Sequence, residues 1–259
     1  MQTMGSRRHS ACYPSLKGKV IFITGGGSGI GAALVQRFSW QGAKVAFVDI
    51  EKALSEAVVT SLSEHVHPPV FIECDIRDIA ALQMAIERVG RDLGEVSVLV
   101  NNAANDTRHK IEDVTVEYWD NRMAINQRPM FFAAQAVIPQ MKRLGGGSII
   151  NFGSVSTRIG SNFPAYMTAK AGAHGLTKGL ARDLGPFNIR VNTLVPGWVM
   201  TERQRREHLT PEGEARIDAL QAIPTRIQPD DIAAMALFLA ADDSALCTSQ
   251  EFIVDGGWI

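Results

Sequence analysis

The sequence is poor in cysteine and contains no long apolar run. Three cysteines stand among 259 residues, far apart and without a CxxC pair. This odd number and wide spacing argue against a disulfide framework and fit the reduced thiols of a cytoplasmic protein. No stretch approaches the roughly 18 consecutive apolar residues that a membrane helix needs, and the first residues carry two arginines without the apolar core of a secretory signal. We therefore expect a cytoplasmic protein without a membrane partner.

An excess of charge of either sign is also missing. The 26 Lys and Arg residues nearly balance the 27 Asp and Glu residues, which leaves a formal net charge of -1. Without a basic field, nucleic acid is not an expected partner. The six histidines lack companions at metal-ligand spacing, so we expect no metal site. A chain that is 46% hydrophobic is typical of a globular protein, and its expected partner is a small molecule.

What the sequence does contain is a regular alternation of apolar runs and helix-period segments. Continuous apolar strands separated by helices imply a parallel sheet that is covered on both faces and joined by right-handed crossovers. We predict an α/β fold: a single-domain, doubly wound parallel sheet of seven strands with helices on both faces, spanning residues 16–259 after a flexible arm at 1–15. The expected strands are 20–24, 45–49, 70–74, 98–100, 148–151, 189–194 and 252–254, and the expected helices are 30–40, 53–64, 79–93, 117–143, 165–184 and 230–240.

A glycine-rich turn follows the first predicted strand, at the sheet edge where such folds bind ligands. Gly25 permits a tight turn, Gly29 lets the backbone approach a pyrophosphate, and Gly31 allows the next helix to pack closely on the strand. The first turn of that helix, which includes Ser28 and Ile30, offers free N–H groups to an anion. The cluster predicts a dinucleotide site, while its spacing alone also fits a flexible turn.

Asp49 ends the second predicted strand, at the distance from the glycines where an acidic residue meets the adenosine ribose. Its carboxylate accepts hydrogen bonds from both ribose hydroxyls and repels a 2′-phosphate, so the predicted cofactor is NAD. The alternative role for Asp49 is a cap of the following helix. Asp75 and Ile76 follow the third strand and are the predicted adenine contacts, and Asp75 equally fits a helix cap.

Tyr166 and Lys170 are four residues apart on a predicted helix and therefore share one face. A cation beside the tyrosine favours the phenolate and lowers the tyrosine pKa from about 10 toward the range of a useful base. Ser154 follows the fifth strand and is placed to hydrogen-bond a substrate oxygen. A tyrosine and a lysine at this spacing are more often a surface pair, so the interpretation depends on the neighbouring motifs.

These motifs, in this order, resemble the short-chain dehydrogenase/reductase family, whose Rossmann fold is a compact single domain. The resemblance spans nearly the whole chain from residue 16 and includes the glycine turn and the sequences NNAA, YMTAK and VNTLVPG. It implies that Tyr166 transfers the proton and that Lys170 binds the nicotinamide ribose. It also implies that Ser154 positions the reacting oxygen, that Asn126 holds a water in a proton relay, and that the long helices form a homotetramer. The other cofactor contacts that it implies are Asn102, Ala103, Pro196, Gly197, Val199 and Thr201.

The predicted long helix at 117–143 departs from the family pattern where Arg128 and Pro129 follow Asn126. Proline removes an intrahelical hydrogen bond. A kink at this point is therefore one expected consequence.

Residues 198–224 interrupt the alternation with a polar segment, which the resemblance makes a mobile lid over the substrate. A polar lid disfavours a steroid or an acyl chain, although the same charges fit the solvent face of an amphipathic helix. The segments 13–18, 105–110, 210–215 and 244–248 are similar to bacterial aldose 1-dehydrogenases, particularly those that act on D-xylose. This similarity implies oxidation of the C1–OH of a sugar to a lactone.

The segment between the catalytic serine and tyrosine and the lid supply the expected substrate contacts. Two alternatives stay open: the same catalytic set serves another secondary alcohol or a 3-oxoacyl substrate, or the chain binds NAD without catalysis. The residues expected to bind the substrate are Asn105, Ser154, Arg158, Tyr166, Trp198 and Gln204.

Overall fold

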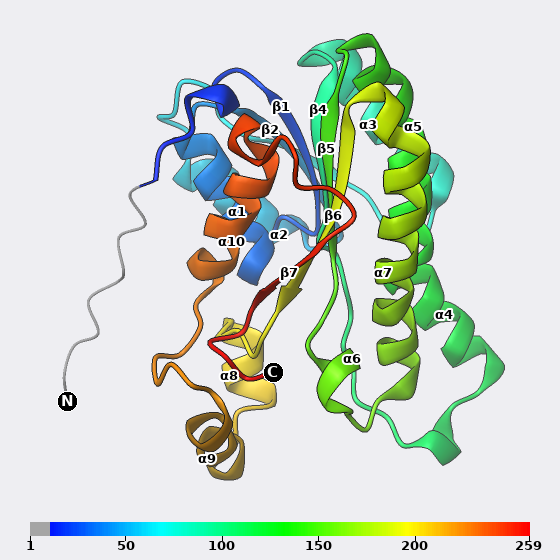
Figure 1. The fold of residues 1–259 in the computed structure, drawn as a ribbon, viewed down its shortest axis with the longest axis vertical. Coiled ribbons are helices and arrows are strands. Elements are labelled where there is room, and N and C mark those ends of the chain that lie inside the picture. Colours follow the sequence, from blue (N-terminus) through cyan, green and yellow to red (C-terminus); the bar gives the residue numbers. More distant parts are fainter. Residues whose placement is uncertain (1–10) are drawn as a thin grey trace.

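Seven parallel strands form the centre of the protein, whose computed structural model describes residues 11–259 (Figure 1). The strand order is β3-β2-β1-β4-β5-β6-β7, and every pairing within it is parallel. This order reverses direction between β1 and β4, which confirms the predicted doubly wound sheet. The strands are β1 Val20–Thr24, β2 Lys44–Asp49, β3 Val70–Glu73, β4 Val96–Asn101, β5 Gly147–Phe152, β6 Ile189–Pro196 and β7 Glu251–Val254.

Helices cover both faces of the sheet, as predicted (Figure 1). Successive strand residues point to opposite faces, so in β1 Ile21 joins one core cluster and Phe22 the other. The first face is covered by α1 Gly29–Trp40, α2 Lys52–Ser61 and α10 Pro229–Ala240. The second is covered by α3 Ile79–Asp92, α4 Val116–Asn126, α5 Arg128–Arg143 and α7 Pro164–Leu184.

The first core cluster joins helices that are far apart in the sequence. Leu34 and Phe38 of α1 lie in the same buried cluster as Ile232 and Leu237 of α10. The two helices are in extensive contact beside β1. This face therefore combines the beginning and the end of the domain.

The helix predicted over residues 117–143 is two helices. Gln127 separates α4 from α5 with φ of -134° and ψ of -56°, outside helical values. Pro129 lies in the first turn of α5, where the missing N–H of a proline costs no hydrogen bond. The proline thus begins a new helix instead of kinking one, and Asn126 becomes the last residue of α4.

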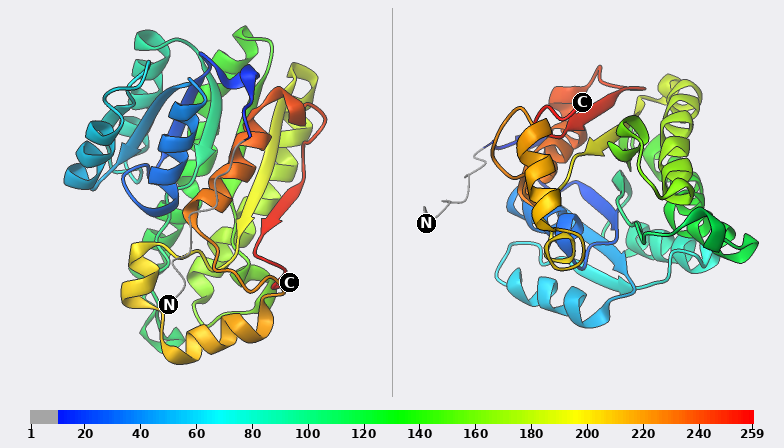
Figure 2. Two further views of the ribbon diagram at one scale, coloured as in Figure 1. Left: turned by 90° about the vertical axis from the view of Figure 1, so that its left-hand side faces the viewer. Right: turned by 90° about the horizontal axis from the view of Figure 1, so that it is seen from below.

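Three short helices lie beyond the carboxyl ends of the strands, where irregular chain was expected (Figure 2). They are α6 Ser156–Ile159, α8 Glu202–Glu207 and α9 Pro211–Leu220. The side chains of Thr201 and Thr210 cap the last two by accepting hydrogen bonds from backbone N–H groups. Single 3-10 turns occur at Pro14–Leu16, Ile111–Asp113, Gly185–Phe187 and Asp242–Ser244.

The predicted flexible arm at 1–15 lies mostly outside the described residues. Within the described part, the backbone N–H of Tyr13 donates to Gln41 Oε1 at 2.8 Å, and Ser15 Oγ accepts from the N–H of Asp242 at 3.1 Å. Leu16 is fully buried. Residues 13–15 therefore contact the folded domain. Across residues 11–259 no helix combines the length and apolarity required to cross a bilayer.

Candidate active site

A cleft of about 1830 Å³ opens at the carboxyl ends of the central strands. It lies at the point where the strand order reverses, between β1 and β4, which is where doubly wound sheets bind ligands. Every residue predicted to contact the cofactor lines this cleft. They are Gly25, Ser28, Gly29, Ile30, Gly31, Asp49, Asp75, Ile76, Asn102, Ala103, Tyr166, Lys170, Pro196, Gly197, Val199 and Thr201.

The glycine turn leaves no room for side chains. Gly25 and Gly29 have φ of +72° and +52°, a region that favours glycine. A Cβ on Gly31 would stand 1.7 Å from the carbonyl oxygen of Gly25. The Ser28 side chain does not cap α1, so N–H groups of its first turn remain open to the cleft. This cradle fits the pyrophosphate of a dinucleotide.

Asp49 is held at the edge of the same cradle. Its Oδ2 accepts a hydrogen bond from the N–H of Gly27 at 2.8 Å, and its Oδ1 accepts one from the N–H of Glu51 at 3.0 Å. The next cleft-lining residues are Ile50 and Glu51, neither of which is a cation. The adenosine end of the cleft is therefore acidic.

Asp75 is already paired with a cation. The Arg77 guanidinium contacts both carboxylate oxygens at 2.5 to 3.0 Å. These hydrogen bonds lower the pKa of Asp75. An adenine contact would share this carboxylate with Arg77.

Polar side chains tie the ends of β1 and β4 together. Thr24 Oγ1 accepts from the N–H groups of Asn102 and Ala103, each at 3.1 Å. Asn102 Nδ2 donates to the carbonyl oxygens of Thr24 and Gly25 at 3.1 and 2.9 Å. The asparagine therefore fixes the glycine turn as well as the floor of the cleft.

Lys170 and Tyr166 project from one face of α7, as their spacing predicted. Lys170 is 1% exposed and its Nζ donates to the carbonyl oxygen of Phe152 at 2.9 Å. The same Nζ lies 5.8 Å from the centre of the Tyr166 ring. A buried chain of hydrogen bonds holds α7 on the sheet, because Thr177 Oγ1 accepts from Asn151 Nδ2.

Burial dominates the electrostatics of this pair. Burial lowers the pKa of Lys170 to about 8, against a smaller opposing effect of Asp106. Burial also raises the pKa of Tyr166, and Asp106 raises it further. Hydrogen bonding to Ser154 and the charges of Arg108 and Arg203 lower it by less. Desolvation of the phenolate therefore outweighs the charges of Arg108 and Arg203, and the lowering of the Tyr166 pKa that was expected from Lys170 is not found.

Ser154 has one hydrogen to give. Its Oγ accepts from Ser156 Oγ at 2.9 Å and from the N–H of Ser156 at 3.2 Å. Since the oxygen serves as an acceptor twice, its single O–H is available either to Tyr166 or to a substrate oxygen.

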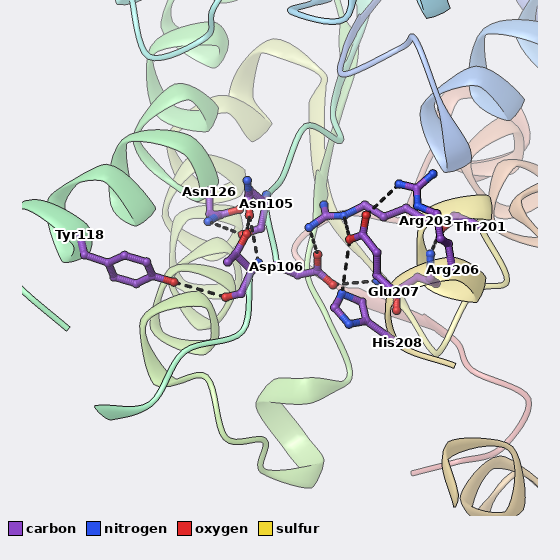
Figure 3. A network of polar contacts seen from close by, with 11 residues as sticks. Asn105, Asp106, Tyr118, Asn126, Thr201, Arg203, Arg206, Glu207 and His208 are labelled. Atoms are coloured by element: carbon purple, nitrogen blue, oxygen red, sulfur yellow. Dashed lines mark hydrogen bonds and ion pairs between the residues drawn. The ribbon is translucent and has the colours of Figure 1, made fainter. Parts of the chain in front are cut away.

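Asn126 is fully buried behind the cleft and does not line it. Its Oδ1 accepts from the N–H of Asn105 at 2.8 Å, and its Nδ2 donates to the carbonyl oxygens of Asn105 and Arg122, both at 3.1 Å (Figure 3). In this structure Asn126 therefore anchors the loop after β4, and the water relay implied by the resemblance stays a prediction.

The predicted substrate residues fall into two groups. Asn105, Ser154, Tyr166, Trp198 and Gln204 line the cleft. Arg158 does not line it, because its guanidinium turns to the carboxylate of Glu251 on β7. That carboxylate is also 3.0 Å from His174 Nδ1. The prediction for Arg158 is corrected accordingly: it braces α6 against the sheet edge.

Several cleft residues were missed by sequence reasoning. Asp106 and Arg203 form an ion pair of 3.2 Å across the substrate end, and the Arg108 guanidinium lies 4.0 Å from the centre of the Phe163 ring. Trp258 lies 6.2 Å from Trp198 between ring centres. No local sequence pattern predicts these pairings, because each pairing joins residues that are far apart in the sequence.

From residue 11 onward, no cluster of three His, Cys, Asp or Glu side chains is arranged to hold an ion. The cysteines of this part are free thiols.

Comparison with known proteins agrees with this architecture. Residues 25–259 match a family model described as enoyl-(acyl carrier protein) reductase. The chain is 52% identical to D-xylose 1-dehydrogenase of Caulobacter vibrioides over 250 residues, which cover 96% of this chain and 99% of the relative. It is 48% identical to a probable galactose dehydrogenase of Rhizobium meliloti, covering 96% of this chain and 98% of the relative.

Solved structures show the same fold. A blue fluorescent protein from a metagenomic library, in complex with NADPH, is 36% identical with a TM-score of 0.87, covering 94% of this chain and 99% of that one. A variant of a Serratia marcescens short-chain dehydrogenase/reductase is 34% identical with a TM-score of 0.87 and the same coverage. With the cleft, the glycine cradle and these relatives, the chain belongs to the short-chain dehydrogenase/reductase family and is an oxidoreductase that acts on CH–OH groups.

Proposed function

We propose that the protein oxidises the C1–OH of a cyclic aldose to the lactone, with NAD⁺ as the electron acceptor. The observation that carries the proposal is the polar lining of the substrate end beside Tyr166. This lining brings together Asn105, Asp106, Arg203 and Gln204, which make the substrate end polar and charged, as suits a ligand with several hydroxyl groups. The xylose and galactose dehydrogenases to which the chain is similar support the same substrate class.

The chain's own residues supply the acid–base chemistry. When bound, NAD⁺ would supply the acceptor for the hydride from C1, and the task left to the chain's own residues is to remove the hydroxyl proton. Tyr166 accepts that proton on its phenolate oxygen, and the Ser154 O–H donates to the substrate oxygen and steadies it. Lys170 holds the nicotinamide ribose and faces the tyrosine ring. The products are the lactone, NADH and one proton.

The preference for NAD over NADP rests on Asp49. A 2′-phosphate would be brought close to the carboxylates of Asp49 and Glu51, which repel it. The basic residue that follows Asp49 most closely in the sequence is Lys52. Its Nζ lies 3.8 Å from Glu73 Oε2, so its charge is paired with another carboxylate. Since the similar blue fluorescent protein is in complex with NADPH, the relatives do not decide this preference.

We also propose a homotetramer formed through the long helices. Phe131 on α5 is 46% exposed, and a Cβ at Gly175 or Gly179 on α7 would meet open space. These exposed apolar and small residues suit close helix packing between subunits. Light scattering at micromolar concentration measures the mass directly, and a monomer would contradict this part of the proposal.

The test is a substrate panel read by the absorbance of the reduced nicotinamide. Pentoses and hexoses are supplied with NAD⁺ or NADP⁺, and a simple secondary alcohol and a 3-hydroxyacyl thioester are included as alternatives. We expect turnover of at least one aldose with NAD⁺ and detection of the lactone as hydroxamate. Turnover confined to the alcohol or the thioester would overturn the sugar assignment. Binding of NADH without turnover of any substrate would indicate a non-catalytic protein.

A further inference from the structure

The loop of residues 105–110, after β4, connects the substrate end of the cleft to its surroundings. On one side it is fixed to α4: Asn126 clamps both backbone groups of Asn105, and the Tyr118 hydroxyl donates to the carbonyl oxygen of Thr107 at 3.3 Å (Figure 3). The same hydroxyl lies 3.0 Å from His109 Nδ1. The loop is thus a rigid platform built on α4.

On its other side the platform meets the lid helix α8 through a single carboxylate. Asp106 Oδ1 lies 3.2 Å from Arg203 Nη2, and Asp106 Oδ2 accepts from Gln204 Nε2 at 2.8 Å (Figure 3). Both oxygens are therefore engaged by α8. The Asp106 side chain is 19% exposed, so the ion pair is partly shielded from water and is stronger than an exposed one.

The α8 helix has little else to hold it in place. It is six residues long, which is too short to be stable alone. Within α8, Arg203 also pairs with Glu207 at 2.9 Å. Outside the helix, Arg205 donates to Gln228 Oε1 at 3.1 Å, a contact between exposed side chains.

The same carboxylate lines the cleft that contains Tyr166 and Lys170. The charged groups that act on Tyr166 are Asp106 and Arg108 from the loop and Arg203 from α8, with Lys170 from its own helix near the ring. Asp106 raises the pKa of Tyr166 and Lys170, whereas Arg108 and Arg203 lower that of Tyr166. A substitution that removes the charge of Asp106 or Arg203 should therefore change the pKa of Tyr166.

We propose that Asp106 is a positioning residue of the reaction, whose carboxylate latches α8 over Tyr166 through Arg203 and Gln204. Its two oxygens are committed to the lid, so it acts through α8 and not as an acceptor for substrate. Gln204, expected to contact the substrate, then serves first as half of this latch. The effect on catalysis rests on the proposed function, while the latch itself is a property of the protein alone.

Two substitutions separate the latch from a merely structural role. Asp106→Asn and Arg203→Gln each break the ion pair, so both should expose α8. A protease that cuts after glutamate, at Glu202 and Glu207, should cleave either variant roughly tenfold faster than wild type. Neither substitution alters a cleavage site. The matched control is Arg205→Gln, which removes the same charge from the same helix without touching Asp106 and should change the cleavage rate less than twofold.

The pH profiles should move in opposite directions. Loss of the Asp106 charge removes an influence that raises the pKa of Tyr166, so the acid limb of kcat/KM for sugar oxidation should shift down by about half a pH unit. Loss of the Arg203 charge removes an influence that lowers the same pKa, so the limb should shift up by a similar amount. A structural defect alone would move both profiles the same way or not at all.

The outcomes are distinguishable from failure of the proposed function. Faster cleavage of both variants with opposite shifts supports the proposal. Unchanged cleavage of both, or equal shifts, overturns it, even if wild type oxidises sugars. If wild type oxidises no sugar, the proposed function fails, and the cleavage rates still decide whether the latch exists.

Discussion

The two ends of the cleft are built from different materials. At the cofactor end the contacts are made by the main chain, in a glycine turn where even one methyl group lacks room. At the substrate end they are made by charged and polar side chains from distant segments, such as Asp106 and Gln204, which are 98 residues apart. The cofactor end is thus defined by close steric packing of the main chain, and the substrate end by interactions between side chains.

This difference teaches which changes each end tolerates. Close packing makes the cofactor end sensitive to changes in side-chain volume. At the substrate end, which lies under short helices, the charges of Asp106, Arg108 and Arg203 shift the pKa of Tyr166. Changes of volume should therefore matter most at the cofactor end, and changes of charge should matter most at the substrate end.

The largest effect is expected where the two ends meet, at Tyr166→Phe. Because the phenolic oxygen is the proposed proton acceptor, kcat should fall about a thousandfold. NADH affinity, measured by fluorescence titration, should stay within about twofold because both ends remain intact. Turnover equal to wild type would exclude Tyr166 as the base.

The cofactor end is tested by Gly31→Ala. The new Cβ would overlap a backbone carbonyl that cannot move aside, so the free energy of unfolding should fall by roughly 3 kcal/mol in urea denaturation. The control is Gly185→Ala at the end of α7, where φ is -51° and a Cβ meets open space. Equal stability of the two variants would show that the turn is more pliable than its geometry implies.

Lys170 gives a dependence of stability on pH. Its pKa in the folded protein is about 8, below the ordinary value of 10.5, so between these values the unfolded chain binds a proton that the native state does not. Its contribution therefore rises with pH from about 8 toward 10.5 and is lost as pH falls through 8. Relative to Lys170→Met, wild type should gain about 2 kcal/mol between pH ~8 and ~9.5, measured by urea denaturation. A constant difference between the two proteins would contradict the low pKa.

The smallest effect is expected from charge at the cofactor end, in Asp49→Asn. The amide keeps an acceptor for the Gly27 N–H but no longer repels a phosphate. The ratio of kcat/KM for NAD⁺ over NADP⁺ should fall about tenfold. Asp75→Asn is the control, since Arg77 already neutralises that carboxylate. If both substitutions leave the NAD⁺ to NADP⁺ ratio unchanged, residues other than Asp49 discriminate against NADP⁺.

The contrast between the two ends also explains what could be predicted from sequence. All seven strands were located to within two residues at each end, because a doubly covered parallel strand is a continuous apolar run. The glycine turn and Asp49 could be predicted because strand ends and glycines are local signals, whereas the contacts at 102–103 and 196–201 were implied by the family resemblance. The helix break at Gln127 was missed, since the apolar period continues through it and only Pro129 hinted at the new start.

The substrate end resisted prediction for a physical reason. Arg158 was assigned to the pocket by its position after Ser154, but its partner Glu251 lies 93 residues away on β7. Asp106 stands in a polar loop with nothing to distinguish it from a solvated residue. Pairings between side chains of distant segments depend on the tertiary fold, and a single sequence does not encode them in any local pattern.

The packing of α1 on α10 has a consequence for synthesis of the chain on the ribosome. The apolar face of α1, with Leu34 and Phe38, finds its cover only in residues near the end of the chain, including Ile232 and Leu237. Until those residues leave the exit tunnel, the apolar face of α1 in the first βαβ unit stays exposed to solvent. Nascent chains that stop before these residues should therefore be bound by chaperones that recognise apolar surfaces.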